Sequence, residues 1–282
     1  MGTALAVDIG GTKIAVGLVT SDGRLVRSAS APTPGDDLFA RLLVLVDEVR
    51  GDGSPEVCGV GCGGPMSIGG EDVSPLNIPQ WRGFRLRSQL AGATGLPTFV
   101  DNDAKALALG EGWVGAAQGV DDYLGMVVST GVGGGIVLNG RLVDGASGNA
   151  GHIGHITVVP DGRECPCGAR GCLEAEASGT AIAARTGRPA AAADRQLRAE
   201  TGTLVGRAVA SVANLLDLRL AVVAGSVALG FGEPFFTAAQ AEIHRRARLD
   251  FSRGTRIVPG ALGPDGPLIG AAALAFRASS GA

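Results

Sequence analysis

The chain has 282 residues, which is enough for two domains with separate hydrophobic cores. Hydrophobic residues make up 45% of it but are dispersed, so no apolar run suggests a membrane span. The formal net charge is −3 and no dense run of Lys and Arg is present, which argues against a nucleic-acid-binding protein. The N-terminal segment lacks the basic and long apolar regions of a secretory signal, so we expect a cytoplasmic protein.

The N-terminal segment predicts a β-hairpin with a glycine turn. Residues 5–7 form a short apolar strand, residues 8–13 (DIGGTK) break it, and residues 14–19 resume it, with a third strand at 24–31. Two adjacent glycines let the backbone approach a ligand, while Thr12 and backbone N–H groups can donate to phosphate oxygens. Asp8 can orient Mg²⁺ or its bound water. An ordinary hairpin also favours Gly-Gly, so this motif alone leaves both interpretations open.

Three polar residues separate the next predicted strand from a helix. Residues 38–49 predict an amphipathic helix, residues 57–61 a strand that runs into Gly63-Gly64-Pro65, and residues 97–100 a strand that ends at Asp101-Asn102-Asp103. A helix is expected at 104–113, and Asn and Asp are preferred helix caps. Alternatively, one carboxylate accepts a proton from a hydroxyl group while Asn102 binds a neighbouring group. A cap usually needs one residue, whereas this segment has three.

A second glycine-rich segment repeats the first pattern. Residues 126–129 predict a strand, residues 130–135 (TGVGGG) a turn, and residues 136–138 and 141–143 a hairpin around Asn139-Gly140. This repetition suggests two related domains that face each other across a cleft, with nucleotide phosphates between the two turns. A third glycine turn at residues 224–227 follows a strand at 220–223 and is a weaker candidate for contact with the adenosine.

One histidine and three cysteines lie within eighteen residues: His155, Cys165, Cys167 and Cys172. A closed structural zinc site uses four N or S ligands, and Gly168 and Gly171 give a short loop the freedom to wrap an ion. The alternative is a set of buried thiols, but the polar, glycine-rich surroundings are not typical of a core. Three clustered cysteines in a total of five favour a metal site in a reducing compartment over a disulfide framework. We expect Cys58 and Cys62 to be packing thiols.

Five motifs in this order resemble the ROK family of bacterial sugar kinases and sugar-responsive repressors: DIGGTK, VDNDAKALALGE, VVSTGVGGGIV, GHIGHITVVPDGRECPCGARGCLEA and VVAGSVA. The resemblance extends from Leu5 to about Ala275. It implies an actin-like ATPase fold of the hexokinase type, with two ribonuclease H-like α/β domains flanking a cleft and a structural zinc loop. The implied small N-terminal domain spans residues 1–116 plus 270–282, and the larger C-terminal domain spans residues 117–269.

The resemblance also implies roles for individual residues. Asp103 would be the catalytic base that accepts the proton of the sugar 6-hydroxyl as this oxygen attacks the γ-phosphorus of ATP. The implied sugar-binding residues are Gly64, Asn77, Asn102, Asp103, His152, His155 and Glu174. The implied contacts with ATP and its Mg²⁺ are Asp8, Gly10, Gly11, Thr12, Lys13, Thr130, Gly131, Gly133, Gly134 and Gly225. The implied zinc ligands are His155, Cys165, Cys167 and Cys172. His155 would thus serve both zinc and sugar, and the metal would fix the orientation of its ring.

One position departs from the family's pattern. ROK sugar kinases usually carry a glutamate three residues before the zinc histidine, where this chain has His152. A carboxylate only accepts hydrogen bonds, whereas a neutral imidazole offers one donor and one acceptor. The carbonyl of an N-acetyl group at C2 would suit the histidine and would be repelled by a glutamate. The AGHIGH segment is similar to that of the family's N-acetylmannosamine kinases, so we expect phosphorylation of N-acetylmannosamine at O6. A glucokinase or another amino-sugar kinase is the nearest alternative.

A sugar sensor without catalytic activity is the second class of function to consider. Repressors of the family place a helix-turn-helix domain before the kinase-like body, whereas DIGGTK begins here at Asp8, so we expect no DNA-binding domain. The presence of Asp103 favours an enzyme. The expected partners are ATP and a small sugar, with no nucleic acid and no membrane, and the resemblance suggests a homodimer or homotetramer.

Overall fold

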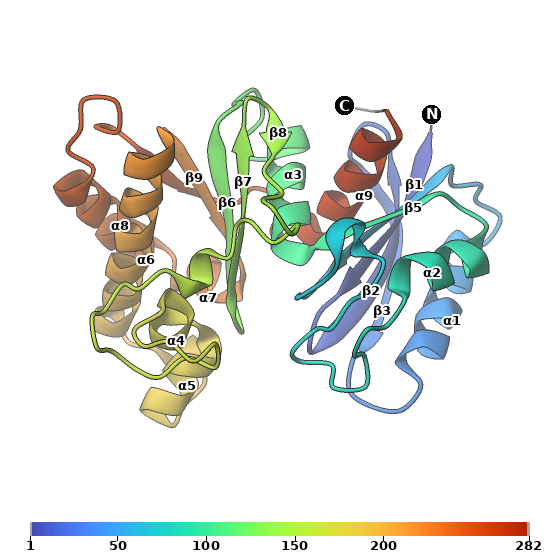
Figure 1. Ribbon diagram of the computed structural model, residues 1–282, viewed down its shortest axis with the longest axis horizontal. Helices are drawn as coiled ribbons and strands as arrows, with labels where there is room; N and C mark the ends of the chain where they lie inside the picture. The colour runs from blue at the N-terminus through green and yellow to red at the C-terminus, as the bar shows by residue number, and fades with distance from the viewer. Residues whose placement is uncertain (1, 281–282) are drawn as a thin grey trace. The chain divides into compact units, whose positions relative to one another are not determined.

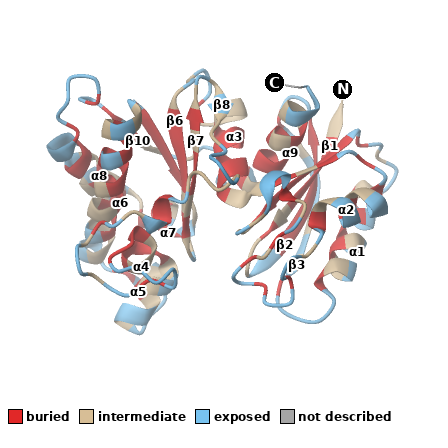
Figure 2. Cartoon of the chain, viewed as in Figure 1, coloured by how far each residue is buried: buried red, intermediate tan, exposed pale blue. Residues whose placement is uncertain are grey.

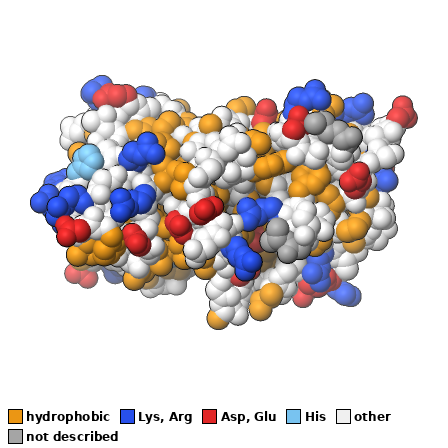
Figure 3. All heavy atoms as spheres, turned by 90° about the horizontal axis from the view of Figure 1, so that it is seen from above, with side chains coloured by type: hydrophobic (Ala, Val, Ile, Leu, Met, Phe, Trp, Pro, Cys, Tyr) orange, Lys and Arg blue, Asp and Glu red, His pale blue; other side chains and the backbone are white. Residues whose placement is uncertain are grey.

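The computed structural model describes residues 2–280, which form two compact units (Figure 1). Unit 1 holds the described residues of the ranges 2–115, 144–150 and 262–280, and unit 2 holds residues 116–143 and 151–261. Each unit contains one five-stranded sheet and a hydrophobic core of its own. Among the described helices, none is both long and apolar enough to cross a membrane. On the face shown in Figure 3, Lys and Arg side chains are interspersed with Asp and Glu.

Unit 1 is a mixed sheet covered by helices on both faces. Its strands are β1 (Thr3–Ile9), β2 (Lys13–Thr20), β3 (Leu25–Pro32), β4 (Val57–Cys62) and β5 (Thr98–Asn102), in the spatial order β3-β2-β1-β4-β5. The first three strands are antiparallel, whereas β1, β4 and β5 are parallel. Side chains of β1 alternate between the two faces: Leu5 and Val7 belong to one buried cluster, and Ala4 and Ala6 to another. Figure 2 shows in red that β1 is largely buried.

The helices of unit 1 are α1 (Leu38–Arg50), α2 (Leu86–Thr94), α3 (Asp103–Val114) and α9 (Gly266–Ser279). Short 3₁₀ turns, η1 (Ile68–Gly70) and η4 (Gly263–Asp265), lie in the same unit. Leu42 of α1 and Leu90 of α2 pack in the cluster that contains Leu5, and Leu268 of α9 packs in the cluster that contains Ala4. The C-terminal helix α9 therefore completes the core of the unit that the N-terminal strand begins.

Unit 2 repeats this topology. Its strands are β6 (Tyr123–Val128), β7 (Val132–Leu138), β8 (Arg141–Leu142), β9 (Leu220–Ala224) and β10 (Arg256–Pro259), in the order β10-β9-β6-β7-β8. Its α-helices are α4 (Leu173–Ala177), α5 (Gly179–Thr186), α6 (Arg195–Leu216), α7 (Ser226–Phe231) and α8 (Glu233–Arg246), with 3₁₀ turns η2 (Ile153–His155) and η3 (Ala190–Ala192). Strands β6, β7 and β8 form an antiparallel meander, and β9 and β10 continue the sheet in parallel with β6, as β4 and β5 do with β1. The duplication expected from the two glycine turns is therefore confirmed, and with it the predicted actin-like fold class.

The glycine-rich segment of residues 130–135 forms a shorter turn than predicted. Strand β7 begins at Val132, so Gly133 and Gly134 lie inside the strand, opposite Val127 and Met126. A Cβ at Gly134 would lie 3.0 Å from the Gly125 carbonyl oxygen and 3.2 Å from the Gly151 carbonyl oxygen. Close approach of backbones, rather than a turn, favours glycine at this strand position.

Helix α9 packs against β4 and α3 through glycines. A Cβ at Gly59 of β4 would lie 1.9 Å from the carbonyl oxygen of Ala271, and a Cβ at Gly270 would lie 2.4 Å from the carbonyl oxygen of Ala106 in α3. The backbones of these elements are therefore in direct contact. Since α3 begins at Asp103, this packing fixes the position of a predicted site residue.

Replacing Gly270 by alanine is expected to lower the free energy of unfolding by about 2–4 kcal/mol, because the new methyl group meets backbone atoms that cannot rotate away. Gly92→Ala in α2 is the matched control, since no described atom lies within 4 Å of a Cβ built there. This control should raise the stability by up to about 1 kcal/mol because alanine favours a helix more than glycine does. Denaturant unfolding of both variants measures the difference, and equal stabilities would contradict the packing described.

Candidate functional site

Polar residues of unit 1 gather at the carboxyl ends of three parallel strands. The register places Asp8 of β1 opposite Gly61 of β4, and Gly61 opposite Asp101 of β5. Asp103 follows β5 directly, and its Cα atom would lie 3.4 Å from a Cβ at Gly61. Ligands of open α/β sheets bind at such carboxyl edges. The topology thus makes neighbours of Asp8 and Asp103, which are far apart in the sequence.

The two carboxylates influence each other. The pKa of Asp8 is raised from 3.8 to about 7, mainly by burial and also by the charge of Asp103, while the charge of Lys13 acts in the opposite direction. Cys62 at the end of β4 is fully buried, and burial raises its pKa well above the ordinary value, with additional effects from Asp103 and Asp8. Ionisation of all these groups together is therefore unfavourable at this edge unless a cation is present. Carboxylate oxygens around such a site suit Mg²⁺ bound to nucleotide phosphates.

Asp101, Asn102 and Asp103, at the junction of β5 and α3, have two kinds of contact. The backbone N–H of Ala104 donates to Oδ1 of Asn102 at 3.0 Å and to Oδ1 of Asp103 at 2.8 Å, so both residues cap α3 as the structural interpretation predicted. Asp101 instead pairs with Lys105, with Oδ2 and Nζ 2.9 Å apart. Asp103 is still partly exposed at the helix start. Capping is therefore compatible with a role for Asp103 as a proton acceptor.

The DIGGTK turn between β1 and β2 is held by a residue that the sequence did not single out. Thr33, which is buried, donates from Oγ1 to the carbonyl oxygen of Gly10 at 2.6 Å and from its N–H to the carbonyl oxygen of Thr12 at 2.9 Å. Thr12 and Lys13 are exposed. The turn is thus supported from within the unit and presents its outer residues to solvent, as a phosphate-binding turn requires.

Two further predicted sugar-binding residues lie beside these elements. A Cβ at Gly11 would lie 2.6 Å from Cβ of Asn77, and both residues line a pocket of about 460 Å³ in unit 1. Gly64, in the loop after β4, lies next to Asn102, whose Nδ2 would be 3.8 Å from a Cβ at Gly64. Unit 1 therefore brings its predicted sugar and nucleotide residues to one edge of its sheet.

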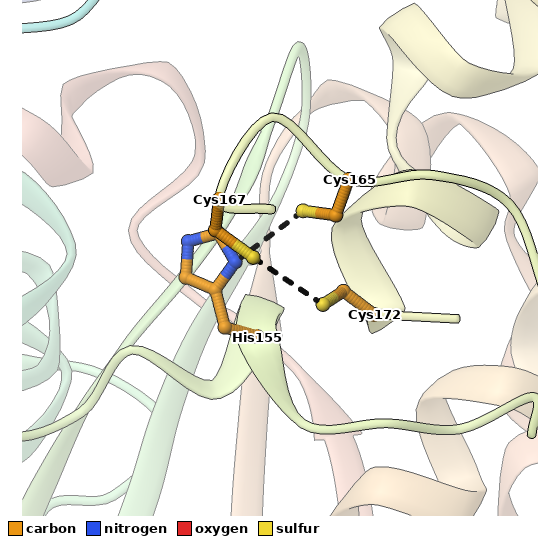
Figure 4. Close-up of side chains that lie close together, drawn as sticks. All are labelled: His155, Cys165, Cys167 and Cys172. Atoms are coloured by element: carbon orange, nitrogen blue, oxygen red, sulfur yellow. Dashed lines mark hydrogen bonds between the residues drawn. The ribbon is translucent and has the colours of Figure 1, made fainter. Parts of the chain in front are cut away.

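In unit 2, the predicted metal ligands converge (Figure 4). Nδ1 of His155 lies 3.6 Å from Sγ of Cys165, and Sγ of Cys167 lies 3.7 Å from Sγ of Cys172. The four ligand atoms are all within 4.8 Å of one another. In a tetrahedral site with Zn–S bonds of about 2.3 Å, neighbouring ligand atoms are about 3.8 Å apart. The four residues therefore fit a structural zinc ion, and Figure 4 shows the second ring nitrogen of His155 pointing away from the thiols.

The loop that carries the thiols depends on two glycines with positive φ. Gly168 and Gly171 have φ of 90° and 70°. A Cβ at Gly171 would also lie 1.7 Å from the carbonyl oxygen of Val159, so only glycine fits there. These two positions confirm the backbone freedom that the sequence indicated, and they bring Cys167 and Cys172 to the same point.

The thiol loop is connected to the second glycine turn through Glu174. This residue lies in α4, two positions after Cys172, and its Oε2 accepts the N–H of Val132 at 2.8 Å. A Cβ at Gly131 would lie 2.7 Å from the same oxygen. Gly225 has φ of 98°, and a Cβ there would lie 2.4 Å from the carbonyl oxygen of Val128, at the end of the parallel neighbour β6. Unit 2 thus brings these glycine turns together.

Not every predicted residue joins these groups. Gly133 and Gly134 lie inside β7, as described above, rather than in the turn at Thr130. His152 is exposed, with its ring centroid 6.1 Å from that of His155. Lys105 was missed as a partner of Asp101, because Asp101 lies at the end of β5 and Lys105 in the first turn of α3, so no single helix or strand pattern pairs them. The contacts of Thr33 leave no comparable signal in the sequence because they depend on the tertiary structure.

The sequence of this chain is similar to a known protein family and to several kinases. Residues 4–278 match the family model described as the ROK family. The glucokinase of Thermotoga maritima is 42% identical over 186 residues, which cover 63% of this chain and 58% of the relative. The N-acetylmannosamine kinase of Yersinia pestis is 37% identical over 253 residues, which cover 82% of this chain and 86% of the relative. The match spans less than two thirds of the first two glucokinases, 58% and 57% of their lengths.

Solved structures agree over nearly the whole chain. A ROK family glucokinase from Streptomyces griseus, in complex with glucose and AMPPNP, has a TM-score of 0.86 and 31% identity, and the match covers 98% of this chain and 100% of that one. A ROK family transcriptional regulator, a homologue of the E. coli MLC protein, has a TM-score of 0.82 and 26% identity, covering 96% of this chain and 77% of that one. The same fold therefore occurs in a kinase and in a regulator.

Purified protein is expected to contain one zinc ion per chain, and Cys172→Ala should lose most of it because three ligands hold the metal less tightly than four. Cys58→Ala is the matched control, since Cys58 is a buried thiol of β4 outside the cluster. Elemental analysis after dialysis measures the zinc content. Equal zinc content in the two variants would contradict the assignment of Cys172.

Asp8→Asn is expected to stabilise the protein at pH 8 but not at pH 4. Because the pKa of Asp8 is about 7 in the folded protein and 3.8 is its ordinary value, the folded protein retains a proton between these pH values that the unfolded chain has released. The stability of the wild type therefore falls as pH rises through this window. Asp8 is partly exposed, so we expect a gain on the order of 1–3 kcal/mol at pH 8. Unfolding curves at both pH values test this, and a gain of the same size at pH 4 would count against it.

Proposed function

Since this chain belongs to the ROK family, we propose that it is an ATP-dependent kinase that phosphorylates the 6-hydroxyl of a hexose or N-acetylhexosamine, with N-acetylmannosamine as the favoured substrate. The observation that carries this proposal is the position of Asp103 beside Asp8 at the carboxyl edge of the unit 1 sheet. A proton acceptor next to a metal-binding carboxylate is the minimum that phosphoryl transfer to a hydroxyl group needs.

In the proposed reaction, Asp103 accepts the proton of the sugar 6-hydroxyl while Asn102 and Gly64 position the sugar. Asp8 would hold Mg²⁺ or its bound water, and the ion would supply positive charge to neutralise the phosphates. The exposed residues Thr12 and Lys13 face the phosphates. Because Asp103 caps α3 through one oxygen, its carboxylate has a fixed orientation before the substrate arrives.

The cysteine cluster has a separate, structural role within unit 2. We assign it a structural zinc held by His155, Cys165, Cys167 and Cys172. With Nδ1 of His155 directed at Cys165, the other nitrogen of the ring is available to a sugar hydroxyl. Metal-ligating histidines take their ring orientation from such pairs of contacts. Glu174, in the helix that follows Cys172, is a second proposed sugar contact.

The preference for N-acetylmannosamine rests on His152. This side chain is exposed and follows Gly151, whose φ is 101°, at the start of the turn that carries His155. An imidazole can donate a hydrogen bond to an acetamido carbonyl, which a glutamate cannot do. The 37% identity to the N-acetylmannosamine kinase of Yersinia pestis over 82% of the chain supports the same choice. The 42% identity to a glucokinase over 63% of the chain keeps glucose as the alternative substrate.

A panel of sugars tests the proposal. Mg·ATP with N-acetylmannosamine should release ADP faster than with N-acetylglucosamine, glucose or mannose. Asp103→Asn should lower kcat by about 10²–10⁴-fold, because asparagine keeps the cap on Ala104 but cannot accept the proton. A preference for glucose would reject the favoured substrate and leave the kinase in place. Sugar binding without turnover in the wild type would instead favour a sensor.

The variant His152→Glu tests the origin of the sugar preference. It should lower kcat/KM for N-acetylmannosamine relative to glucose by about tenfold or more, because a carboxylate repels the acetamido carbonyl. His244→Glu is a control for the same chemical change, since His244 lies on α8, is exposed and binds Gln240. An unchanged ratio between the two sugars in His152→Glu would refute the role of His152.

A further inference from the structure

Lys105 is a buried cation that none of the roles above explains. It lies in the first turns of α3, and its side chain is only 2% exposed. Its Nζ lies 2.9 Å from Oδ2 of Asp101 and 2.8 Å from Oδ1 of Asp144, and it donates to the carbonyl oxygen of Gly148 at 3.2 Å. Burying an ammonium group is costly unless several partners compensate for the lost water. Lys105 has three such partners from two separate segments.

The first segment is the end of β5. Oδ2 of Asp101 binds Lys105, while Oδ1 of the same carboxylate accepts the N–H of Asn102 at 2.7 Å. Asn102 and Asp103 follow immediately and cap α3. Lys105 therefore fixes the carboxylate of Asp101. This carboxylate in turn holds the backbone of Asn102, which precedes Asp103.

The second segment is Asp144–Ala150, which belongs to unit 1 although the chain on both sides of it belongs to unit 2. The N–H of Ala150 closes it by donating to the carbonyl oxygen of Asp144 at 2.9 Å. A Cβ at Gly148 would lie 3.6 Å from Cα of Ile68, also in unit 1. The segment then continues directly into Gly151 and His152. Lys105 thus holds the stretch of chain that leads to His152 and His155.

The charges explain why a lysine is needed here. Burial raises the pKa of Asp101, Asp144 raises it further, and Lys105 lowers it. Without the ammonium group, the two carboxylates would repel each other. Asp144 is 69% exposed and would be well solvated without this partner, whereas Asp101 is only 15% exposed. The contact with Asp144 therefore serves to hold the segment rather than to solvate Asp144.

We propose that Lys105 is a positioning residue that ties the Asp101–Asp103 turn to the Asp144–Ala150 segment, so that Asp103 and the chain leading to His152 are set together. The inference rests on the proposed function in naming sugar binding as the affected step. Lys105 should affect binding of the acceptor sugar more than binding of ATP. The reason is that both segments held by Lys105 are adjacent in the sequence to proposed sugar-binding residues.

Steady-state kinetics of Lys105→Met, Asp144→Ala and the double variant test this role. Lys105→Met should raise the KM for the sugar tenfold or more and the KM for ATP less than threefold. Asp144→Ala should raise the sugar KM by a smaller factor. In the double variant the sugar KM should equal that of Lys105→Met, since Asp144 acts only through Lys105. Asp250→Ala, which removes a 96% exposed carboxylate paired with Arg253, should change neither constant.

Hydrogen exchange gives a second readout that does not require catalysis. Amides of residues 144–150 should exchange at least tenfold faster in Lys105→Met and in Asp144→Ala, while those of residues 123–138 should be unchanged. Unchanged exchange in residues 144–150, or equal increases in both KM values, would overturn the proposal. If Lys105→Met does not fold, Asp144→Ala carries the test because its side chain is exposed. A wild type inactive with every sugar would reject the proposed function, and exchange would still decide whether Lys105 holds the segment.

Discussion

Two carboxylates, Asp8 and Asp103, are held close together at one edge of a sheet although their charges repel. The parallel register of β1, β4 and β5 brings them together, and the backbone of α9 packs directly against β4 and against α3, the helix that begins at Asp103. The raised pKa of Asp8 is a direct consequence of burial and of this neighbour. Folding thus maintains an unfavourable charge arrangement that a cation bound to phosphate can relieve. The proposed kinase activity depends on this arrangement.

Unit 2 also brings ionisable side chains close together, here three thiols and one imidazole. Three thiols and an imidazole converge within 4.8 Å, which is the spacing that a tetrahedral metal site needs. The same loop continues into α4, where Glu174 supports the turn at Gly131. One metal site can therefore fix the orientation of His155 and, through the short path from Cys172 to Glu174, the second glycine turn as well. This would explain why the candidate metal site lies next to residues with proposed functional roles.

The sequence predicts those features whose causes are local. The hairpin around DIGGTK, the cap on α3 and the cysteine loop each follow from residues within about twenty positions of one another, and all three are found. The length of β7 was predicted wrongly because Gly134 lies close to the backbones of Gly125 and Gly151, nine and seventeen positions away, and not in a turn. The contacts of Thr33, and the contact between Lys105 and Asp144, could not be predicted for the same reason. Their partners are distant in the sequence, and periodicity carries no information about such contacts.

The most direct test of the account is the titration of the Asp8 carboxylate by NMR with and without Mg·ATP, using Asp8→Asn to assign its signal. The account predicts a pKa of about 7 in the protein alone and a clear decrease when Mg·ATP binds, because the cation stabilises the ionised carboxylate. A carboxylate that titrates near 4 in the protein alone, or that does not respond to Mg·ATP, would contradict the assignment of this sheet edge as the site of phosphoryl transfer.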